Sequence, residues 1–261
     1  MHSDSDTLSY EIERLFLDYS DAWEGYQEEF VDLGDMVGRW NGLWGFAGHF
    51  HFKAANFERR LDSVIEQLEG PGRRYTWIVG PSTKPNSLAD CLVARGFHET
   101  ETWDGLVLRD LSAVLVADES IEVEELAESN VQDYVNFMRA LTGNGISEER
   151  ARAQASRYLK LQPHPATIYM ARLDGHFAGY SALHMNSSGA AYLRQAITLP
   201  GYQRRGVYNR LLAHRLKVAR KLGCTRALVQ AMRTTSSPML RRRGFTQVCT
   251  LTGYARPNDS K

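Results

Sequence analysis

The residues whose types and spacing are best suited to chemistry form the segment Gln203-Arg204-Arg205-Gly206-Val207-Tyr208. A strand-like run at 190–198 precedes this segment, and a leucine-rich helical pattern follows it to about Leu222. A strand, a glycine-containing turn and a helix start leave unpaired backbone amides that point outward with partial positive charge. Such helix starts bind phosphate, and Gly206 would let the backbone approach the anion closely. The alternative is an ordinary loop before a solvated basic helix.

Positive charge is concentrated in the same part of the chain. Residues 203–243 contain twelve Lys and Arg and no Asp or Glu, whereas the whole chain has 31 Lys+Arg, 31 Asp+Glu and no net charge. This pattern favours a site for one polyanionic ligand over a nucleic-acid surface, which usually requires a basic excess over the whole domain. The helical pattern predicts a solvent side with Arg210, Arg215, Lys217, Arg220 and Lys221. It predicts a core side with Leu211, Leu212, Leu216, Ala219 and Leu222.

Several other kinds of site are disfavoured. The three cysteines, Cys91, Cys224 and Cys249, are scattered without metal-ligand spacing, so we expect no metal site and a reduced, cytoplasmic setting. His49-x-His51 has no third ligand nearby, which favours packing in an aromatic core over metal binding. Neither GxxxxGK[ST] nor a GxGxxG after a strand occurs. We expect no signal peptide and no membrane segment, because no run of about 18 apolar residues is present.

Composition divides the chain into two parts. Residues 1–36 contain eleven acids and one base, and all five tryptophans lie at or before Trp103. We therefore expect two domains, 1–116 and 117–261, joined by a linker at 112–120. Expected helices span 8–19, 56–68, 88–95, 130–141, 148–161 and 207–222, with a short one ending at Gly244. Expected strands lie within 38–52 and at 75–79, 106–111, 121–125, 167–173, 177–184, 190–198, 226–232 and 248–254, with a hairpin turn at Asp174-Gly175.

A short internal repeat links the two parts. CLVARGF at 91–97 matches MLRRRGF at 239–245. Each copy follows a strand, a Ser/Thr/Pro loop and a short helix, and each precedes a strand-forming segment. The shared order of elements indicates that the match is structural.

The order of strand, ITLPGYQRRGVYNRLL, strand RALVQAM and SSPMLRRRGF resembles the GNAT superfamily of acyl-CoA-dependent N-acyltransferases over about residues 121–255. The family's pyrophosphate loop reads Gln/Arg-x-x-Gly-x-Gly/Ala, which Gln203 and Gly206 match and Tyr208 does not. Residues 38–111 resemble the degenerate N-terminal half of tandem GNAT proteins, which we expect not to bind coenzyme A through such a loop. The expected fold class is a mixed α/β (α+β) sheet in two GNAT-like units. The C-terminal unit is complete, with a mostly antiparallel central sheet flanked by helices.

The resemblance implies a co-substrate and residues that hold it. Backbone groups of Ala196, Ile197 and Thr198 would contact the pantetheine arm and thioester carbonyl of acetyl-CoA. The loop Gln203, Arg204, Arg205, Gly206, Val207 and Tyr208 would hold the pyrophosphate through its amides. The acetyl group would pass directly to a primary amine of a small molecule or peptide in a ternary complex, without a metal, a membrane or a nucleic acid. The sequence defines neither the acceptor nor the oligomeric state.

The catalytic groups are less well defined. The family often supplies the proton for the leaving thiolate from a Tyr four residues before the closing Gly, and here that residue is Leu240. Ser236 and Ser237 are the candidate donors, with water, non-standard chemistry or simple helix capping as alternatives.

Candidate general bases are His184, Tyr192 and Gln195 on the strands that flank the expected cleft, or an acidic residue of the N-terminal part. The alternative for His184 is a buried structural role. Other functions left open are a non-catalytic acyl-CoA-binding sensor, and a transferase that uses another acyl donor or a hydroxyl acceptor.

Overall fold

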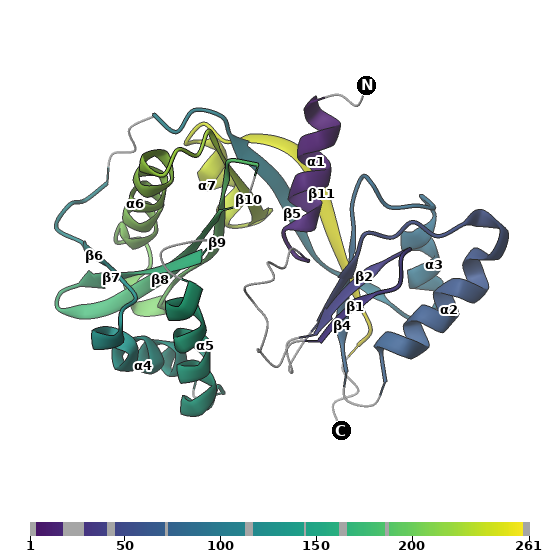
Figure 1. The fold of residues 1–261 in the computed structure, drawn as a ribbon, viewed down its shortest axis with the longest axis horizontal. Coiled ribbons are helices and arrows are strands. Elements are labelled where there is room, and N and C mark those ends of the chain that lie inside the picture. Colours follow the sequence, from purple (N-terminus) through teal and green to yellow (C-terminus); the bar gives the residue numbers. More distant parts are fainter. Residues whose placement is uncertain are drawn as a thin grey trace. The chain divides into compact units, whose positions relative to one another are not determined.

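The computed structural model describes residues 4–17, 29–40, 45–70, 73–112, 117–143, 145–161, 166–185 and 188–257. The chain forms two compact units (Figure 1). Unit 1 contains residues 1–106 and 230–261, and unit 2 contains residues 107–229. The units thus differ from the expected division at residue 116, because the C-terminal strand pairs with a strand of the N-terminal part.

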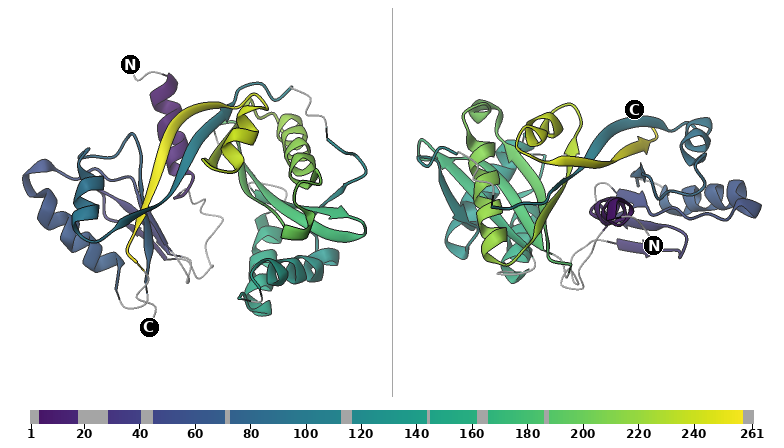
Figure 2. Two further views of the ribbon diagram at one scale, coloured as in Figure 1. Left: turned by 180° about the vertical axis from the view of Figure 1, so that it is seen from behind. Right: turned by 90° about the horizontal axis from the view of Figure 1, so that it is seen from above.

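Unit 1 is a mixed sheet with helices. Its elements are α1 (Asp4–Arg14), β1 (Glu29–Asp32), β2 (Val37–Trp40), β3 (Gly45–Gly48), the 3₁₀ helix η2 (Ala54–Asn56), α2 (Phe57–Leu68), β4 (Tyr75–Val79), α3 (Leu88–Ala94), β5 (His98–Leu108), α7 (Ser236–Arg241) and β11 (Thr246–Ala255). The strand order is β1-β2-β3-β4-β11-β5, and β5 and β11 run side by side (Figure 2). Neighbours β1–β2, β2–β3 and β4–β11 are antiparallel, whereas β3 and β4 are parallel.

An aromatic core holds unit 1 together. The five apolar residues that sequence periodicity assigns to one face of α2 are all buried: Phe57, Leu61, Val64, Ile65 and Leu68. They pack with the rings of Phe50 and Trp77, which stack with centroids 5.1 Å apart. Burial of these large side chains away from water is the main stabilising contribution in this unit.

Unit 2 has a mostly antiparallel sheet. Its elements are β6 (Glu122–Glu125), η3 (Glu128–Asn130), α4 (Val131–Leu141), α5 (Glu148–Leu161), β7 (Ala166–Leu173), β8 (His176–Met185), β9 (Ala190–Thr198), η4 (Pro200–Tyr202), α6 (Val207–Lys221) and β10 (Arg226–Met232), whose last three residues fall in unit 1. The strand order is β10-β9-β8-β7-β6, with only the β9–β10 pair parallel. The predicted hairpin turn is confirmed, since Asp174 and Gly175 have φ of 53° and 77°.

Helices cover both faces of this sheet. Neighbouring strand residues point to opposite faces. A Cβ on Gly179 of β8 would lie 2.7 Å from Val207, which places α6 on one face. The ring of Tyr180 packs edge-on against Tyr134 and Phe137 of α4, which therefore lies on the other face.

The internal repeat extends to topology. The order β1-β2-β3-α2-β4-α3-β5 recurs as β7-β8-β9-α6-β10-α7-β11, with the parallel pair at the same step. Gly96 and Gly244 end the short helices with φ of 83° and 89°. After each glycine, a phenylalanine amide donates to a leucine carbonyl of the helix, Phe97 to Leu92 and Phe245 to Leu240.

The start of β5 and the end of α6 differ from the sequence-based assignments. Strand β5 begins at His98 and not at residue 106, because its exposed polar first half is held as a strand by its neighbour β11. The Thr100 Oγ1 hydroxyl of this half also donates to Gly253 O of β11. Leu222 is 43% exposed, since α6 ends at Lys221. No helix in the described ranges is long and apolar enough to cross a membrane.

Candidate functional site

Strand β9 carries a bulge at its centre. Ala182 of β8 pairs with Arg194, but two residues earlier Tyr180 pairs with Ile197, so β9 has one residue more than β8 in this interval. Gln195, within the bulge, has φ of 48°, a left-handed conformation uncommon for residues other than glycine. A bulge bends a strand and re-aims its side chains and backbone groups, and bulges are frequent next to active sites.

A buried arginine of α6 supports this bulge. Arg215 is only 1% exposed, which corrects the expectation that it lies on the solvent side of the helix. Its Nη1 donates to the carbonyl oxygens of Ala182 at 3.1 Å and Arg194 at 3.3 Å. Burial lowers the pKa of Arg215 to about 10, and a hydrogen bond with the side chain of Tyr208 acts in the opposite direction. The guanidinium therefore stays charged at neutral pH and holds both sides of the bulge.

The loop after β9 leads into an uncapped helix start. Arg204 and Gly206 have φ of 61° and 89°, and α6 begins directly afterwards at Val207. No side chain caps this helix, and its first turn contains no acidic residue. The first amides of α6 thus form the partial positive end of a 15-residue helix, and no acidic side chain of its first turn competes for them. This geometry suits a phosphate group.

The two loop arginines contribute less charge than their types suggest. Both side chains are exposed. Arg205 pairs with Asp174 in the β7–β8 turn at 2.7 Å, and its guanidinium lies 5.7 Å from the ring centroid of Tyr202. Its charge is therefore partly neutralised within the protein.

The residues Ala196, Ile197 and Thr198 form the end of β9 between the bulge and the loop. Thr198 Oγ1 is buried and has no hydrogen-bond partner among the described residues. A buried hydroxyl without a partner is unfavourable, so this group is available to a ligand that reaches the strand end. The segment thereby fits an extended polar ligand such as a pantetheine arm.

His184 and Tyr192 lie opposite each other on β8 and β9. Both are buried, and His184 contacts a residue that sequence reasoning missed. The hydroxyl of Tyr158, from α5, lies 3.4 Å from His184 Nε2 and donates to Gln195 Oε1 at 3.3 Å. The structure thus brings together a histidine, a tyrosine and the bulge side chain Gln195. Tyr158 lies on the buried face of α5 together with Ala151 and Ala155. This helical spacing could have predicted that Tyr158 is buried, but not that its hydroxyl contacts His184 and Gln195.

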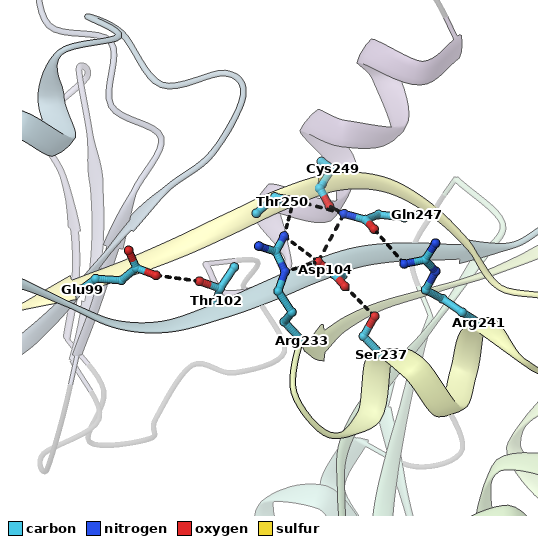
Figure 3. Close-up of polar contacts among 9 residues, drawn as sticks. All are labelled: Glu99, Thr102, Asp104, Arg233, Ser237, Arg241, Gln247, Cys249 and Thr250. Carbon is cyan, nitrogen blue, oxygen red and sulfur yellow. Dashed lines mark hydrogen bonds and ion pairs between the residues drawn. The ribbon is translucent and has the colours of Figure 1, made fainter.

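Ser236 and Ser237 open α7 in unit 1. Ser237 is 1% exposed, and its hydroxyl donates to Asp104 Oδ2 at 2.6 Å (Figure 3). The capping position of this helix is Thr235, which makes no side-chain cap bond, so Ser237 acts as a partner of Asp104 and not as a cap. Leu240, which occupies the position of the family's tyrosine, is fully buried like Leu92 in the repeat.

Asp104 is the centre of this polar cluster. Its carboxylate is buried and also accepts from Arg233 Nε at 3.0 Å, Arg233 Nη2 at 2.9 Å and Gln247 Nε2 at 3.2 Å (Figure 3). These donors come from the ends of β10 and β11, and Ser237 comes from α7. One carboxylate of β5 therefore joins the end of β10, the first turn of α7 and the start of β11.

The two histidines at 49 and 51 lie in unit 1. The ring of His49 packs edge-on against Tyr10 with centroids 5.2 Å apart. The sequence favoured packing of this histidine in the aromatic core, but His49 is not part of the buried core cluster. Within the described ranges, no group of three or more His, Cys, Asp or Glu is arranged to hold a metal ion.

Comparison with known proteins agrees with this geometry. Residues 131–245, which include the bulge, the loop and both serines, match the Acetyltransferase (GNAT) family. No curated protein sequence matches the chain.

Solved structures share the fold at low sequence identity. A GCN5-related N-acetyltransferase from Kribbella flavida has a TM-score of 0.62 and 18% identity over 88% of this chain and 90% of that chain. A GCN5-related N-acetyltransferase from Sphaerobacter thermophilus has a TM-score of 0.64 and 14% identity over 85% of this chain and 78% of that chain. A tandem GNAT protein from the clavulanic acid biosynthesis pathway has a TM-score of 0.57 and 14% identity over 86% of this chain and 79% of that chain. The chain thus contains a GNAT acetyltransferase family domain at residues 131–245 in a mixed α/β fold like that of these GNAT structures.

Proposed function

We propose that the protein is an acyl-CoA-dependent N-acyltransferase that moves acetyl from acetyl-CoA directly to a primary amine in a ternary complex. The observation that carries this proposal is the continuous sequence of bulge, left-handed glycine and uncapped helix start between Gln195 and Val207, within the segment that matches the acetyltransferase family.

Acetyl-CoA would supply an activated acyl thioester, and the chain would bind and orient it. In this proposal the amides from Gln203 to Tyr208 hold the pyrophosphate, and the groups of Ala196, Ile197 and Thr198 hold the pantetheine arm. The positive φ of Gly206 turns the chain directly into α6, which keeps the first helical amides uncovered. Tyr208, where the family has a small residue, directs its side chain to Arg215. A small residue at 208 is therefore not needed to leave the amides accessible.

The reaction requires a neutral amine, a polarised carbonyl and a proton for the leaving thiolate. His184 and Tyr192 are our candidates for removing the amine proton, with Tyr158 orienting the imidazole of His184. For the thiolate we favour Ser236 over Ser237, because the Ser237 hydroxyl already donates to Asp104.

Unit 1 is proposed to be a structural or substrate-shaping half. It repeats the strand and helix order of the acyl-CoA-binding part, which supports its origin as a degenerate copy. Its connection from β3 to α2, which corresponds to the connection from β9 to α6, has no Gln-x-x-Gly-x-Gly/Ala sequence, so we do not assign it an acyl-CoA site of this type. An amine-rich small molecule or a peptide amine is the proposed acceptor.

The experiment is to mix the protein with acetyl-CoA and a panel of primary amines and to follow free thiol. Amine-dependent thiol release, with N-acetylated product by mass spectrometry, is the expected result. Leu240 is fully buried where the family has a hydroxyl, and this favours a second candidate, a non-catalytic acyl-CoA sensor. Binding of acetyl-CoA without thiol release for every amine would select the sensor. No binding at all would reject both functions.

A further inference from the structure

We propose that unit 1 contains a second ligand site, a pocket for a small aromatic carboxylate bounded by Arg14, His49 and His51. The pocket is a cavity of about 270 Å³ within this unit. It lies outside the residues assigned to acyl-CoA, so the proposal goes beyond the transferase function and does not depend on it.

The pocket lies where the strands β1, β2 and β3 of unit 1 end or begin. Asp32 at the end of β1 pairs with Val37 at the start of β2, and Val37 pairs with Gly48 at the end of β3. Helix α1 supplies the opposite wall. The lining consists of Tyr10, Arg14, Leu17, Phe30, Asp32, Gly34, Met36, Val37, His49 and His51. A cavity somewhat below the roughly 300–1,000 Å³ of drug-sized pockets suits a single ring with one polar group.

His49 is the residue that most clearly lacks a partner. Its Nε2 is buried and has no hydrogen-bond partner among the described residues. Its backbone has φ of 56°, a costly conformation that recurs at ligand-binding and active sites. The edge-on contact with Tyr10 fixes the ring in the pocket wall. Nearly all buried polar atoms in proteins are satisfied, so a ligand is the missing partner.

The charges of the lining select an anion. Burial lowers the pKa of His49 to about 4, and the positive charges of Arg14 and His51 act in the same direction. Neutral His49 can donate from Nε2, and Arg14 offers a guanidinium that carboxylates bind well. Asp32 is the one carboxylate among the lining residues, and it already accepts from the amide of Gly34 at 2.8 Å. A cationic ligand would meet Arg14 as well as Asp32, so the proposed preference for an anion rests on the donors of Arg14 and His49.

The remaining lining is apolar. Leu17 and Met36 are already buried, whereas Phe30, which is 49% exposed, and the half-buried Val37 offer surface for a ring or a branched chain. Burial of these side chains by a ligand would remove apolar area from water. The chemistry therefore points to an anionic head at Arg14 and His49 with an apolar body over Phe30.

Three probes that share one phenyl ring and differ in charge test the proposal: benzoate, benzamide and benzylamine. We expect benzoate to bind at least about tenfold more tightly than benzamide and benzylamine not to bind, as measured by calorimetry. Benzoate should also shift the His49 ring resonances of the full-length protein saturably. The substitution His49→Asn, which tolerates a positive φ, and Arg14→Gln should each weaken benzoate binding about tenfold or more.

His98→Gln is the matched control, because His98 is exposed on β5 of the same unit. This variant should keep the benzoate affinity of the parent. Equal affinity for benzoate and benzamide, or unchanged affinity in folded His49→Asn, would overturn the proposal. If His49→Asn does not fold, the parent titration decides, since absence of a saturable His49 shift also overturns it. Acetyl-CoA affinity, measured on the same samples, tests the transferase proposal separately.

Discussion

The Arg215 guanidinium Nη1 lies 3.3 Å from the carbonyl oxygen of Arg194, the last β9 residue paired with β8 before the bulge. The same nitrogen lies 3.1 Å from the carbonyl of Ala182, the β8 partner of Arg194. A single buried side chain of α6 thus donates to both strands where their ladder is interrupted. The helix that begins directly after residues 203–206 therefore also fixes the strand that leads into this loop.

Replacing Arg215 tests this coupling. Arg215→Met leaves two carbonyl groups without this donor, and a buried unsatisfied group costs about 1–3 kcal/mol. We expect the bulge to relax and the KM for acetyl-CoA to rise about tenfold. The KM of Arg215→Lys should lie between those of the parent and Arg215→Met. Arg220→Met, on the exposed side of α6, is the control and should leave KM unchanged. An unchanged KM in folded Arg215→Met would show that the bulge does not depend on this side chain.

The two glycines at the ends of α6 separate backbone strain from ligand binding. Gly206 and Gly223 have φ of 89° and 82°, so alanine at either position is strained by about 1–2 kcal/mol. We expect Gly206→Ala and Gly223→Ala to lower the free energy of unfolding by similar amounts in urea titrations. Only Gly206→Ala should weaken coenzyme A binding, by about tenfold or more in calorimetry. Equal loss of binding in both variants would argue against the loop as the pyrophosphate site.

Local patterns in the sequence predicted most elements of this fold. The periodicity of α2, the bounds of β4, α5, β9 and β10, and the Asp174-Gly175 turn all depend on neighbours in the chain, and all are confirmed. The first half of β5 depends on its neighbour β11, about 150 residues away in the chain. The periodicity of the local sequence does not reveal such long-range pairing. Long-range pairing also explains why residues 230–261 join unit 1.

The candidate site was predictable only where backbone conformation decides it. Gly206 and the helix start follow from glycine, leucine spacing and the preceding strand. Arg215 was assigned to the solvent side, because an arginine among basic residues gives no sign of burial without a carboxylate nearby. The contact of Tyr158 with Gln195 depends on a bulge, which one extra residue creates without any sequence signature.

Asp104 provides a test of the cluster at the start of α7. Asp104→Asn keeps one acceptor and loses the charge that strengthens bonds from Arg233, Ser237 and Gln247. We expect the free energy of unfolding to fall by about 2 kcal/mol in urea titrations. Glu99→Gln, at an exposed residue of the same strand, should change it by less than about 0.5 kcal/mol. Equal stability of the two variants would mean that the cluster is not stabilising.

The two adjacent serines have distinct expected effects. Ser237→Ala removes a bond to Asp104, so it should mainly lower stability, by about 1 kcal/mol. Ser236→Ala should lower kcat about tenfold or more with little change in coenzyme A affinity, if its hydroxyl protonates the thiolate. Steady-state kinetics with free thiol as the readout checks both. Unchanged turnover in the double variant Ser236→Ala plus Ser237→Ala would exclude a serine donor and favour water.

His49 makes stability depend on pH in a direction that can be isolated. Its pKa is about 4 in the folded protein and about 6.5 when unfolded, so the unfolded chain binds more protons between these values. Stability from this residue is therefore present above pH 6.5 and lost as the pH falls through about 4. The shift corresponds to at most about 3 kcal/mol, and to about 1–2 kcal/mol after solvent screening of the partly exposed ring.

Buried Glu13 opposes this effect. Burial raises the pKa of Glu13, so its contribution is largest below its unfolded pKa and is lost as the pH rises through its folded value. The net acid dependence of the parent thus mixes two opposite signs, and a variant is needed to separate them. We expect urea unfolding of His49→Asn at pH 7 and pH 4.5 to show a smaller loss of stability on acidification than the parent. His98→Gln should follow the parent, and an equal acid loss in His49→Asn would mean that His49 is not held neutral by its surroundings.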